Sequence, residues 1–212
     1  MQAQTASTVA NRTGAAGVRS GAATELPRVL FVCTANRCRS PLAEHLMRRA
    51  LRDAGLHALV TSAGLLAGGF PTPATGVRVA AANGLDLTNH RSSRVSARVV
   101  EVSDVILTMT RAHAREIVAL ALESWPRVYP LKQFTEFLEH VELPRRAYFR
   151  DAAMLVGEMR KRKSILGNPD FDAVKDPIGR PPDVWQAVLD DLGDQLDRVV
   201  PALAPLIVGS AR

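Results

Sequence analysis

The segment at positions 31–41 reads FVCTANRCRSP and holds both cysteines of the chain. Cys33 closes a short apolar run, and Arg39 follows it by six positions, directly before a Ser-Pro pair that favours the start of a helix. The loop between them can point its backbone N–H groups inward and bind an anion. The positive end of the helix and the two-pronged Arg39 guanidinium act on the same anion, which predicts a site for a tetrahedral oxyanion.

Such a site would hold the oxyanion directly over the sulfur of Cys33. Cations and helix N-termini favour the thiolate over the thiol, and the thiolate is the nucleophilic form. We therefore expect Cys33 to attack phosphorus. The alternative is a strand-end cysteine beside a surface arginine, because a Cys-x5-Arg spacing alone often arises by chance. The strand before it and the helix start after it strengthen the phosphate-binding interpretation, in which the loop residues are Thr34, Ala35, Asn36, Arg37, Cys38, Arg39 and Ser40.

The surrounding pattern alternates strands and helices. Short apolar runs predict strands at 28–33, 58–62, 104–109 and 127–130. Helical spacing follows them at 41–53, 73–82 and 111–122. This alternation implies an α/β fold, with a four-stranded parallel sheet covered by helices on both faces. Ligands of such sheets bind at the carboxyl ends of the strands, which is where Cys33 lies.

The end of the chain departs from this alternation. Residues 132–165 are predicted to be largely helical, and one apolar stripe is formed by Phe149, Ala152, Val156 and Met159. The basic run at 160–163 that follows is expected to be a solvated helix face; docking of an acidic partner or covering of the active site are the alternatives. Asp183 is expected to cap a last helix, whose buried face consists of Trp185, Val188, Leu189, Leu192, Leu196 and Val199.

Composition narrows the class of protein. The chain has 212 residues, enough for one domain with extensions. The net charge of +6 favours anionic partners, but the aromatic content of 5% and the lack of a nucleic-acid motif argue against nucleic acid. No run of about 18 apolar residues is present, so no membrane span is expected.

The N-terminus and the cysteines bear on location. Residues 1–26 are rich in Ala, Ser, Thr and Gly and have no apolar block, which predicts a disordered tail rather than a secretory signal; an organelle transit peptide is the alternative. Two cysteines five positions apart form neither a disulfide framework nor a common zinc signature. We therefore expect a cytoplasmic protein with no metal and no cofactor.

These features closely resemble the low-molecular-weight protein tyrosine phosphatase family, whose signature is Val-Cys, four loop residues and Cys-Arg-Ser-Pro. Here the signature runs from Val32 to Pro41 and continues as Leu-Ala-Glu. The resemblance covers about residues 27–130 and 170–205 and implies a flavodoxin-like fold, as one phosphatase domain at 27–208 with a helical insertion at about 138–168. Further matches keep the family's order and spacing: 61–64, Gly69, Pro71, 84–87, 90–92, 104–109 and Asp176-Pro177.

The resemblance implies catalytic roles for Cys33, Arg39 and Asp176. Asp176 matches the family's general acid, which protonates the leaving oxygen and then activates water to hydrolyse a phosphocysteine. Taken alone, an aspartate before proline is more often a turn residue. Asp170 and Asp172 are nearby rivals, but neither is followed by proline.

The resemblance also implies a polar network that supports the loop, consisting of Asn36, Ser40, Ser62 and His90. Asn36 tolerates a left-handed backbone, and Ser40 can donate a hydrogen bond to the Cys33 thiolate. Cys38 is expected either to form a reversible disulfide with Cys33 under oxidation or simply to pack as a small buried thiol.

Four features depart from the family's pattern. Ala35 replaces the common loop glycine, and Ile178 stands where an aromatic residue commonly follows Asp-Pro. Arg37 replaces an apolar or small residue at the pocket wall, which disfavours a flat apolar phosphotyrosine and favours acidic substrates. The insertion before the Asp-Pro loop is the fourth. Together these four departures weaken the expectation of tyrosine specificity more than the expectation of phosphatase chemistry.

The expected activity is hydrolysis of phosphomonoesters, with a phosphorylated protein, above all on tyrosine, or a small phosphomonoester as substrate. A tyrosine kinase of a polysaccharide-export system is the partner that the family suggests. A non-catalytic phosphate- or phosphopeptide-binding module is one alternative, although such a module is expected to have lost Cys33, Arg39 or Asp176. Arsenate reductase is the other, although it needs further cysteines downstream and none follows Cys38.

Overall fold

The computed structural model describes residues 26–143, 149–158 and 160–210. The predicted tail, apart from position 26, and Met159 of the predicted apolar stripe lie outside the described residues.

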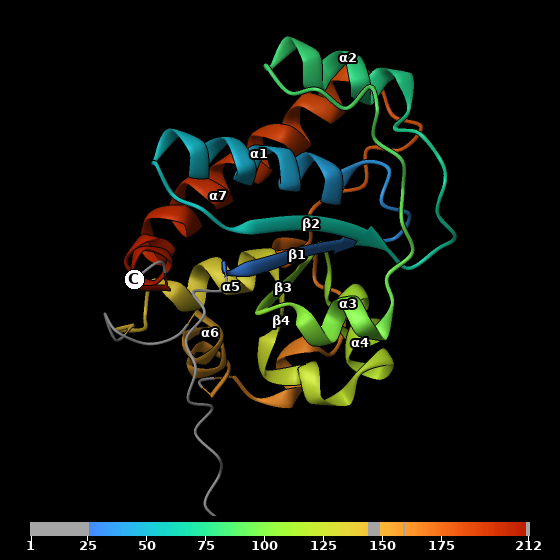
Figure 1. The fold of residues 1–212 in the computed structure, drawn as a ribbon. Coiled ribbons are helices and arrows are strands. Elements are labelled where there is room, and N and C mark those ends of the chain that lie inside the picture. The colour runs from blue at the N-terminus through green and yellow to red at the C-terminus, as the bar shows by residue number, and fades with distance from the viewer. Residues whose placement is uncertain (1–25, 144–148, 159, 211–212) are drawn as a thin grey trace, which may run out of the picture.

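Four parallel strands form the sheet at the centre of the molecule (Figure 1). They are β1 (Arg28–Cys33), β2 (Leu59–Gly64), β3 (Val105–Thr108) and β4 (Val128–Pro130), in the order β2-β1-β3-β4. β1 pairs with β2 from Arg28 opposite Leu59 to Cys33 opposite Gly64. Because every pair is parallel, the strands all end at one edge, and the predicted four-stranded parallel sheet is confirmed.

One face of the sheet carries the larger core. It is covered by α1 (Arg39–Asp53), α7 (Pro182–Ser210) and α5 (Leu131–Leu138), and α2 (Ala74–Ala82) packs on α7. A Cβ atom at Gly76 of α2 would lie 2.4 Å from the ring of Trp185, so the lack of a side chain there lets the two helices approach. The predicted buried face of the last helix is confirmed, since all six of its residues are buried.

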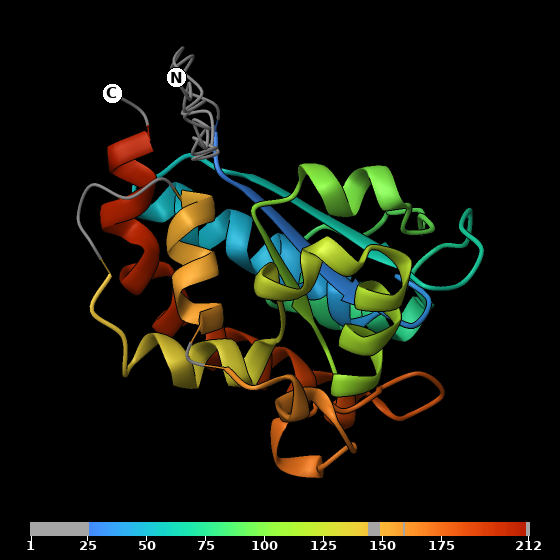
Figure 2. The ribbon, with the colours of Figure 1, turned by 90° about the horizontal axis from the view of Figure 1, so that it is seen from below.

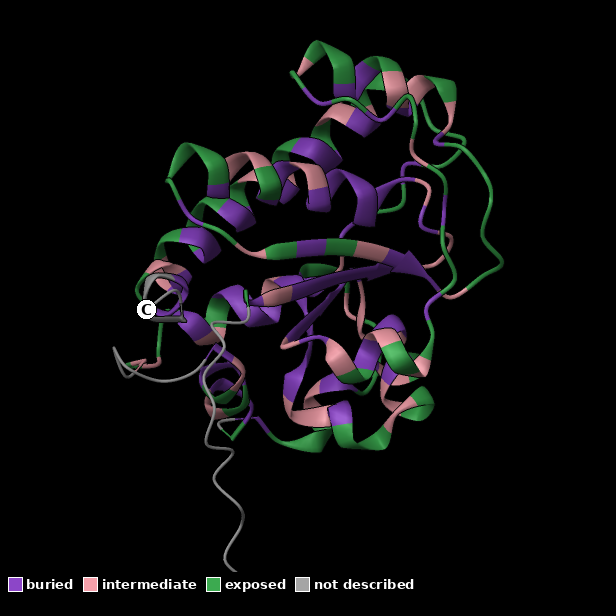
Figure 3. Ribbon diagram, viewed as in Figure 1, coloured by how far each residue is buried: buried purple, intermediate pink, exposed green. Residues whose placement is uncertain are grey.

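The opposite face is covered by α3 (Ala97–Val102) and α4 (Arg111–Leu120). Figure 3 shows the result: β1 and β3 are buried along almost their whole length between the two helical layers, whereas the segment after β2 is exposed. Helix α3 is absent from the pattern predicted above. It begins at Ser96, whose hydroxyl accepts a hydrogen bond from the N–H of Val99.

Two predicted helix starts need correction. α1 begins at Arg39 with Cys38 as its cap residue, so Ser40 and Pro41 lie inside the first turn rather than at its edge. α7 begins at Pro182, which places Asp183 in the first turn and not at the cap. The Asp183 carboxylate still lies at the positive end of the helix, where an acidic side chain is favourable.

The insertion packs through α6 (Phe149–Glu158) against residues 122–127, just before β4, and lies beside the C-terminal part of α7 (Figure 2). The Tyr129 hydroxyl of β4 lies 2.5 Å from the carbonyl oxygen of Ala153 and 2.6 Å from that of Pro126. A Cβ atom at Gly157 would lie 2.4 Å from the Pro126 oxygen, so only glycine fits there. Residues 122–127, 162–165 and 170–172 form the short 3₁₀ helices η1, η2 and η3.

The prediction that the basic run is a solvated helix face holds only in part: 161–163 are exposed but lie outside any α-helix, and Arg160 is not solvated. Arg160 is buried, and its guanidinium lies 4.0 Å from the ring centre of Trp125 and 4.2 Å from that of Tyr129. Its Nη2 donates to the carbonyl oxygen of Trp125 at 2.6 Å. Burial lowers the pKa of Arg160 to about 10. Arg160 therefore fastens the insertion to the sheet, and only 161–163 are exposed.

Candidate active site

The loop after β1 surrounds the sulfur of Cys33. Asn36 takes the left-handed backbone conformation that its residue type allows, with φ of 51°. Its N–H donates to the Cys33 sulfur at 3.3 Å, and the Ser40 hydroxyl lies 3.0 Å from the same sulfur. Ala35 has no positive φ, so the replacement of glycine there brings no backbone strain.

The four predicted members of the supporting network meet around Asn36. Its side-chain amide donates to the hydroxyls of Ser40 at 3.0 Å and Ser62 at 2.7 Å. The Nε2 atom of His90 lies 2.7 Å from the Asn36 carbonyl oxygen. The amide oxygen of Asn36 also accepts from the N–H of Ser93 at 2.9 Å, a contact that no pattern around Ser93 indicated. The loop is thus bonded to β2 and to the segment at 90–93.

Several donors in this loop have no acceptor within the described part of the chain. They are the backbone N–H groups of Ala35, Arg37 and Cys38 and the buried Nε of Arg39. Buried polar groups are normally hydrogen-bonded, so this set fits an anion that binds in the loop. A phosphate group offers the oxygens that these donors need.

Arg39 links the loop to the Asp-Pro segment. Its Nη2 donates to the Asp176 carboxylate at 2.5 Å and to the Thr34 hydroxyl at 3.2 Å. Its Nη1 donates to the carbonyl oxygen of Val174 at 3.3 Å. The side chain of Asp176 is 45% exposed, whereas that of Arg39 is 5% exposed, so the carboxylate can leave the arginine for solvent or substrate.

The structure separates Asp176 from its sequence rivals. The Asp172 carboxylate is buried and accepts from Nε of Arg111 at 2.5 Å and from the side-chain amide of Gln133 at 2.7 Å. Asp170 is exposed and has no ion pair among the described residues. Of the three carboxylates, Asp176 is the one in contact with Arg39.

His113 is a site residue that the sequence reasoning missed. Its Nε2 lies 2.9 Å from the Thr34 hydroxyl, and its Nδ1 lies 3.0 Å from the hydroxyl of Thr110. Burial, reinforced by the Arg39 charge, lowers the pKa of His113 to about 4. The ring is therefore neutral at pH 7 and bridges the two hydroxyls. The only signal in the sequence was a histidine in the first turn after β3, beside the strand end.

Cys38 differs chemically from Cys33. It is buried, and that burial raises the pKa of the Cys38 thiol, with the charges of Cys33 and Asp176 adding to the effect. Both cysteines are free thiols in this structure. Cys38 is thus poorly suited to act as a thiolate nucleophile.

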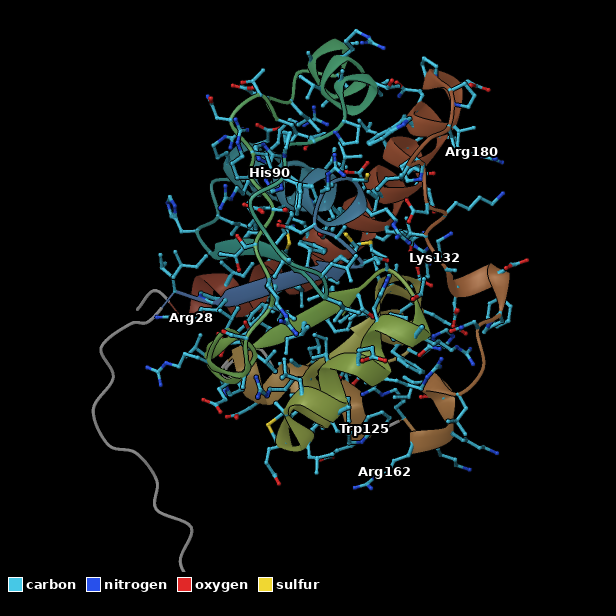
Figure 4. All side chains as sticks on the ribbon, turned by 90° about the vertical axis from the view of Figure 1, so that its right-hand side faces the viewer. Arg28, His90, Trp125, Lys132, Arg162 and Arg180 are labelled. Atoms are coloured by element: carbon cyan, nitrogen blue, oxygen red, sulfur yellow. The ribbon has the colours of Figure 1, made fainter. Side chains whose placement is uncertain are left out.

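A cavity of about 370 Å³ adjoins the ion pair of Arg39 and Asp176. One wall is the start of α4, from Thr110 to His113, and the other consists of Asn168, Pro169, Asp170, Asp172 and Ala173, where the chain leaves the insertion. Figure 4 looks onto this edge of the sheet: His90 lies among the upper loops, Arg180 on the segment entering α7, and Arg162 at the lower edge. The segment that joins the insertion to the Asp-Pro loop therefore contributes to the surroundings of the site.

Comparison with known proteins agrees with this geometry. The family model described as low molecular weight phosphotyrosine protein phosphatase matches residues 28–154. The chain belongs to this family. As a low-molecular-weight phosphatase it is an enzyme that removes phosphate, and the α/β fold predicted from the sequence is that of the family's solved structures.

Two curated relatives illustrate the similarity. A probable low molecular weight protein-tyrosine-phosphatase, EpsP of Ralstonia solanacearum, is 36% identical over 110 residues, which cover 51% of this chain and 73% of the relative. A protein-arginine-phosphatase of Bacillus subtilis is 35% identical over 108 residues, which cover 50% of this chain and 71% of the relative. The crystal structure of a low molecular weight protein tyrosine phosphatase from T. tengcongensis superposes with a TM-score of 0.64 at 26% identity, over 82% of this chain and 98% of the other.

Asp176 lies outside the residues that the family model matches, so its place in this low-molecular-weight phosphatase comes from the structure. Among the described residues, no group of three or more His, Cys, Asp or Glu side chains could hold a metal ion. No helix in the described ranges is long and apolar enough to cross a membrane.

Proposed function

We propose that this phosphatase acts through Cys33 as nucleophile, Arg39 as the oxyanion-binding residue and Asp176 as general acid and base. The observation that carries the proposal is the contact between Arg39 and Asp176, 2.5 Å long, beside a loop in which the Asn36 N–H donates to the Cys33 sulfur. The three groups come from two distant parts of the chain and meet at the carboxyl ends of the strands.

In the first step, a phosphate group enters the loop and takes the place of Asp176 on Arg39. The Asp176 carboxylate, once released from Arg39, takes up a proton from solvent. The Cys33 thiolate attacks phosphorus, the bond from phosphorus to the ester oxygen breaks, and Asp176 gives its proton to that oxygen. The Ser40 hydroxyl, 3.0 Å from the sulfur, stabilises the thiolate by donating a hydrogen bond. Arg39 and the loop N–H groups bind the equatorial oxygens, whose charge grows in the transition state.

In the second step, the Asp176 carboxylate accepts a proton from water as that water attacks the phosphocysteine. The sulfur–phosphorus bond breaks, the thiolate returns, and inorganic phosphate leaves. Asp176 acts as acid in the first step and as base in the second, which explains why its carboxylate needs the freedom that its 45% exposure provides.

The proposed substrate is a phosphorylated protein, with phosphotyrosine as the reacting group, and the proposed location is the cytoplasm. The curated relatives named protein-tyrosine-phosphatases support this reading. A tyrosine kinase of a polysaccharide-export system is the partner that follows from the family resemblance. Because one relative is named a protein-arginine-phosphatase, phosphoarginine is the competing substrate.

The test is phosphate release from an aryl phosphate, phosphotyrosine and phosphoarginine in the presence of EDTA and a reductant. We expect turnover by the natural chain, none by Cys33→Ser, and a slower rate for Asp176→Ala. Asp183→Ala serves as the matched control, since that exposed carboxylate lies in the first turn of α7.

Full turnover by Cys33→Ser would contradict the proposal. If folded protein binds vanadate but turns over no substrate, the chain is instead a phosphate-binding module. The ranking of phosphotyrosine against phosphoarginine decides the reacting group.

A further inference from the structure

The side chain of Arg37 extends from the catalytic loop toward the segment at 65–71 and has no acidic partner. Its Nε donates to the carbonyl oxygen of Pro71 at 2.9 Å, and its guanidinium carbon lies 5.7 Å from the centre of the Phe70 ring. No carboxylate of the described chain pairs with it. These contacts occupy one of its five N–H donors, so its position is set while most of its binding capacity stays open.

A second arginine near the site provides a comparison. The guanidinium carbon of Arg111, in the cavity wall formed by α4, lies at the same distance, 5.7 Å, from the centre of the Phe171 ring. Its charge is balanced by the Asp172 carboxylate at 2.5 Å. The molecule therefore neutralises one arginine at the edge of the catalytic loop and leaves the other, Arg37, unneutralised.

The surroundings of Arg37 are also basic. Residues 54–100 contain a single acidic residue, Asp86, whose carboxylate accepts from Thr88 at 2.6 and 2.9 Å. The same stretch carries four arginines, and two of them pair with the segment beside Arg37: Arg91 opposite Pro71 and Arg94 opposite Gly64. An anionic group arriving on this side of the site meets no opposing carboxylate from these elements.

We propose that Arg37, positioned by Pro71 and Phe70, binds the carboxylate of an acidic side chain close to the phosphorylated residue of a protein substrate. This inference rests on the phosphatase function proposed above. Arg37 and Arg39 are two positions apart, so their Cα atoms are separated by at most about 7 Å. Side chains two positions apart on one face of an extended peptide are also about 7 Å apart. A phosphate on Arg39 thus places a nearby carboxylate within reach of Arg37.

The experiment compares kcat/KM for phosphotyrosine peptides that carry either Glu or Gln at one position, moved from three residues before the phosphotyrosine to three residues after it. For the natural chain we expect a preference for Glu of about twofold to fivefold at one or two positions. The preference should shrink as salt is added, because both charges are solvated. Because the result is the ratio of kcat/KM for the Glu peptide to kcat/KM for the Gln peptide, a change in basal activity that affects both peptides equally cancels.

Four variants decide the assignment. Arg37→Gln should reduce the ratio to about one, and Arg37→Lys should retain part of it because the charge remains while the planar fork is lost. Arg37→Glu should reverse the preference toward a Lys-containing peptide. Arg52→Gln is the control: it removes the same charge from the exposed end of α1, and it should leave the ratio unchanged.

A ratio near one in the natural chain, or an equal fall in Arg52→Gln, would overturn the inference, since the effect would then be absent or due to net charge. Aryl phosphate turnover, measured in parallel, separates the two proposals. Turnover without any peptide preference contradicts only the role of Arg37, whereas a folded chain without turnover contradicts the proposed function itself.

Discussion

Arg39 and Asp176 form an ion pair of 2.5 Å across 137 positions of sequence. In this structure the carboxylate occupies one of the N–H donors that a phosphate would use. The two residues that we propose for oxyanion binding and for proton transfer therefore neutralise each other until an anion enters the loop.

This ion pair predicts opposite effects of Asp176→Asn on binding and on turnover. Removing the carboxylate charge frees Arg39, so vanadate or phosphate should bind up to about fivefold more tightly, the range of a half-exposed ion pair. Turnover should fall by about 10²–10⁴, because the proton donor is lost. Titration with vanadate and steady-state kinetics measure the two effects. If anion affinity falls together with turnover, the ion pair does not compete with the substrate.

The neutral state of His113 predicts a pH dependence of stability. The pKa of His113 is about 4 in the folded chain, against about 6.5 for an exposed histidine. Between these two pH values, His113 binds a proton in the unfolded chain but not in the folded chain. The contribution of neutral His113 to the free energy of unfolding is therefore complete above pH 6.5. It falls by up to about 3 kcal/mol as the pH is lowered toward 4. Urea unfolding between pH 7 and 4 measures this loss.

His113→Gln isolates that contribution, because the partly buried His45, whose pKa is also lowered by burial, remains in both proteins. We expect the variant to show a shallower fall of the free energy of unfolding over the same pH range. Parallel curves for the two proteins would show that His113 does not titrate as described.

Gly64 of β2 lies against the backbone of the catalytic loop, so a substitution there should affect catalysis. A Cβ atom at this position would lie 2.7 Å from the backbone carbon of Ala35 and from the backbone nitrogen of Asn36, where no flexible side chain can yield. Gly64→Ala should therefore displace the loop and lower kcat/KM for aryl phosphates by about tenfold or more, since small misplacements are costly in catalysis. Steady-state kinetics check this. Unchanged kinetics in Gly64→Ala would show that the loop tolerates the shift.

Two helical glycines give a matched pair for stability. A Cβ atom at Gly157 of α6 would lie 2.4 Å from the oxygen of Pro126, whereas one at Gly193 of α7 meets nothing within 4 Å. Gly157→Ala should destabilise the chain by about 1–3 kcal/mol through overpacking. Gly193→Ala should stabilise it by about 0.5–1 kcal/mol through helix propensity. Chemical denaturation of both variants measures the two changes in the free energy of unfolding. If both substitutions changed it in the same direction, the packing of the insertion on η1 would be contradicted.

The sequence alone determined the four-stranded sheet and the loop that carries Cys33 and Arg39. Short apolar runs between helical segments are local patterns, and they predicted all four strands because a parallel sheet buries both faces of each strand. The proposed catalytic loop was equally local, since Cys33, Arg39 and the Ser-Pro pair lie within nine consecutive residues.

Only the tertiary structure decided which aspartate meets Arg39 and how the insertion packs. The proline after Asp176 and the family resemblance favoured it over Asp170 and Asp172, but the contacts that separate these carboxylates are with Arg39 and Arg111, more than 60 positions away. Arg160 belonged to a charge run that is usually solvated, yet two aromatic rings and two carbonyl oxygens bury it. Partners far apart in the chain are brought together by the fold, so no pattern in a short window could identify them.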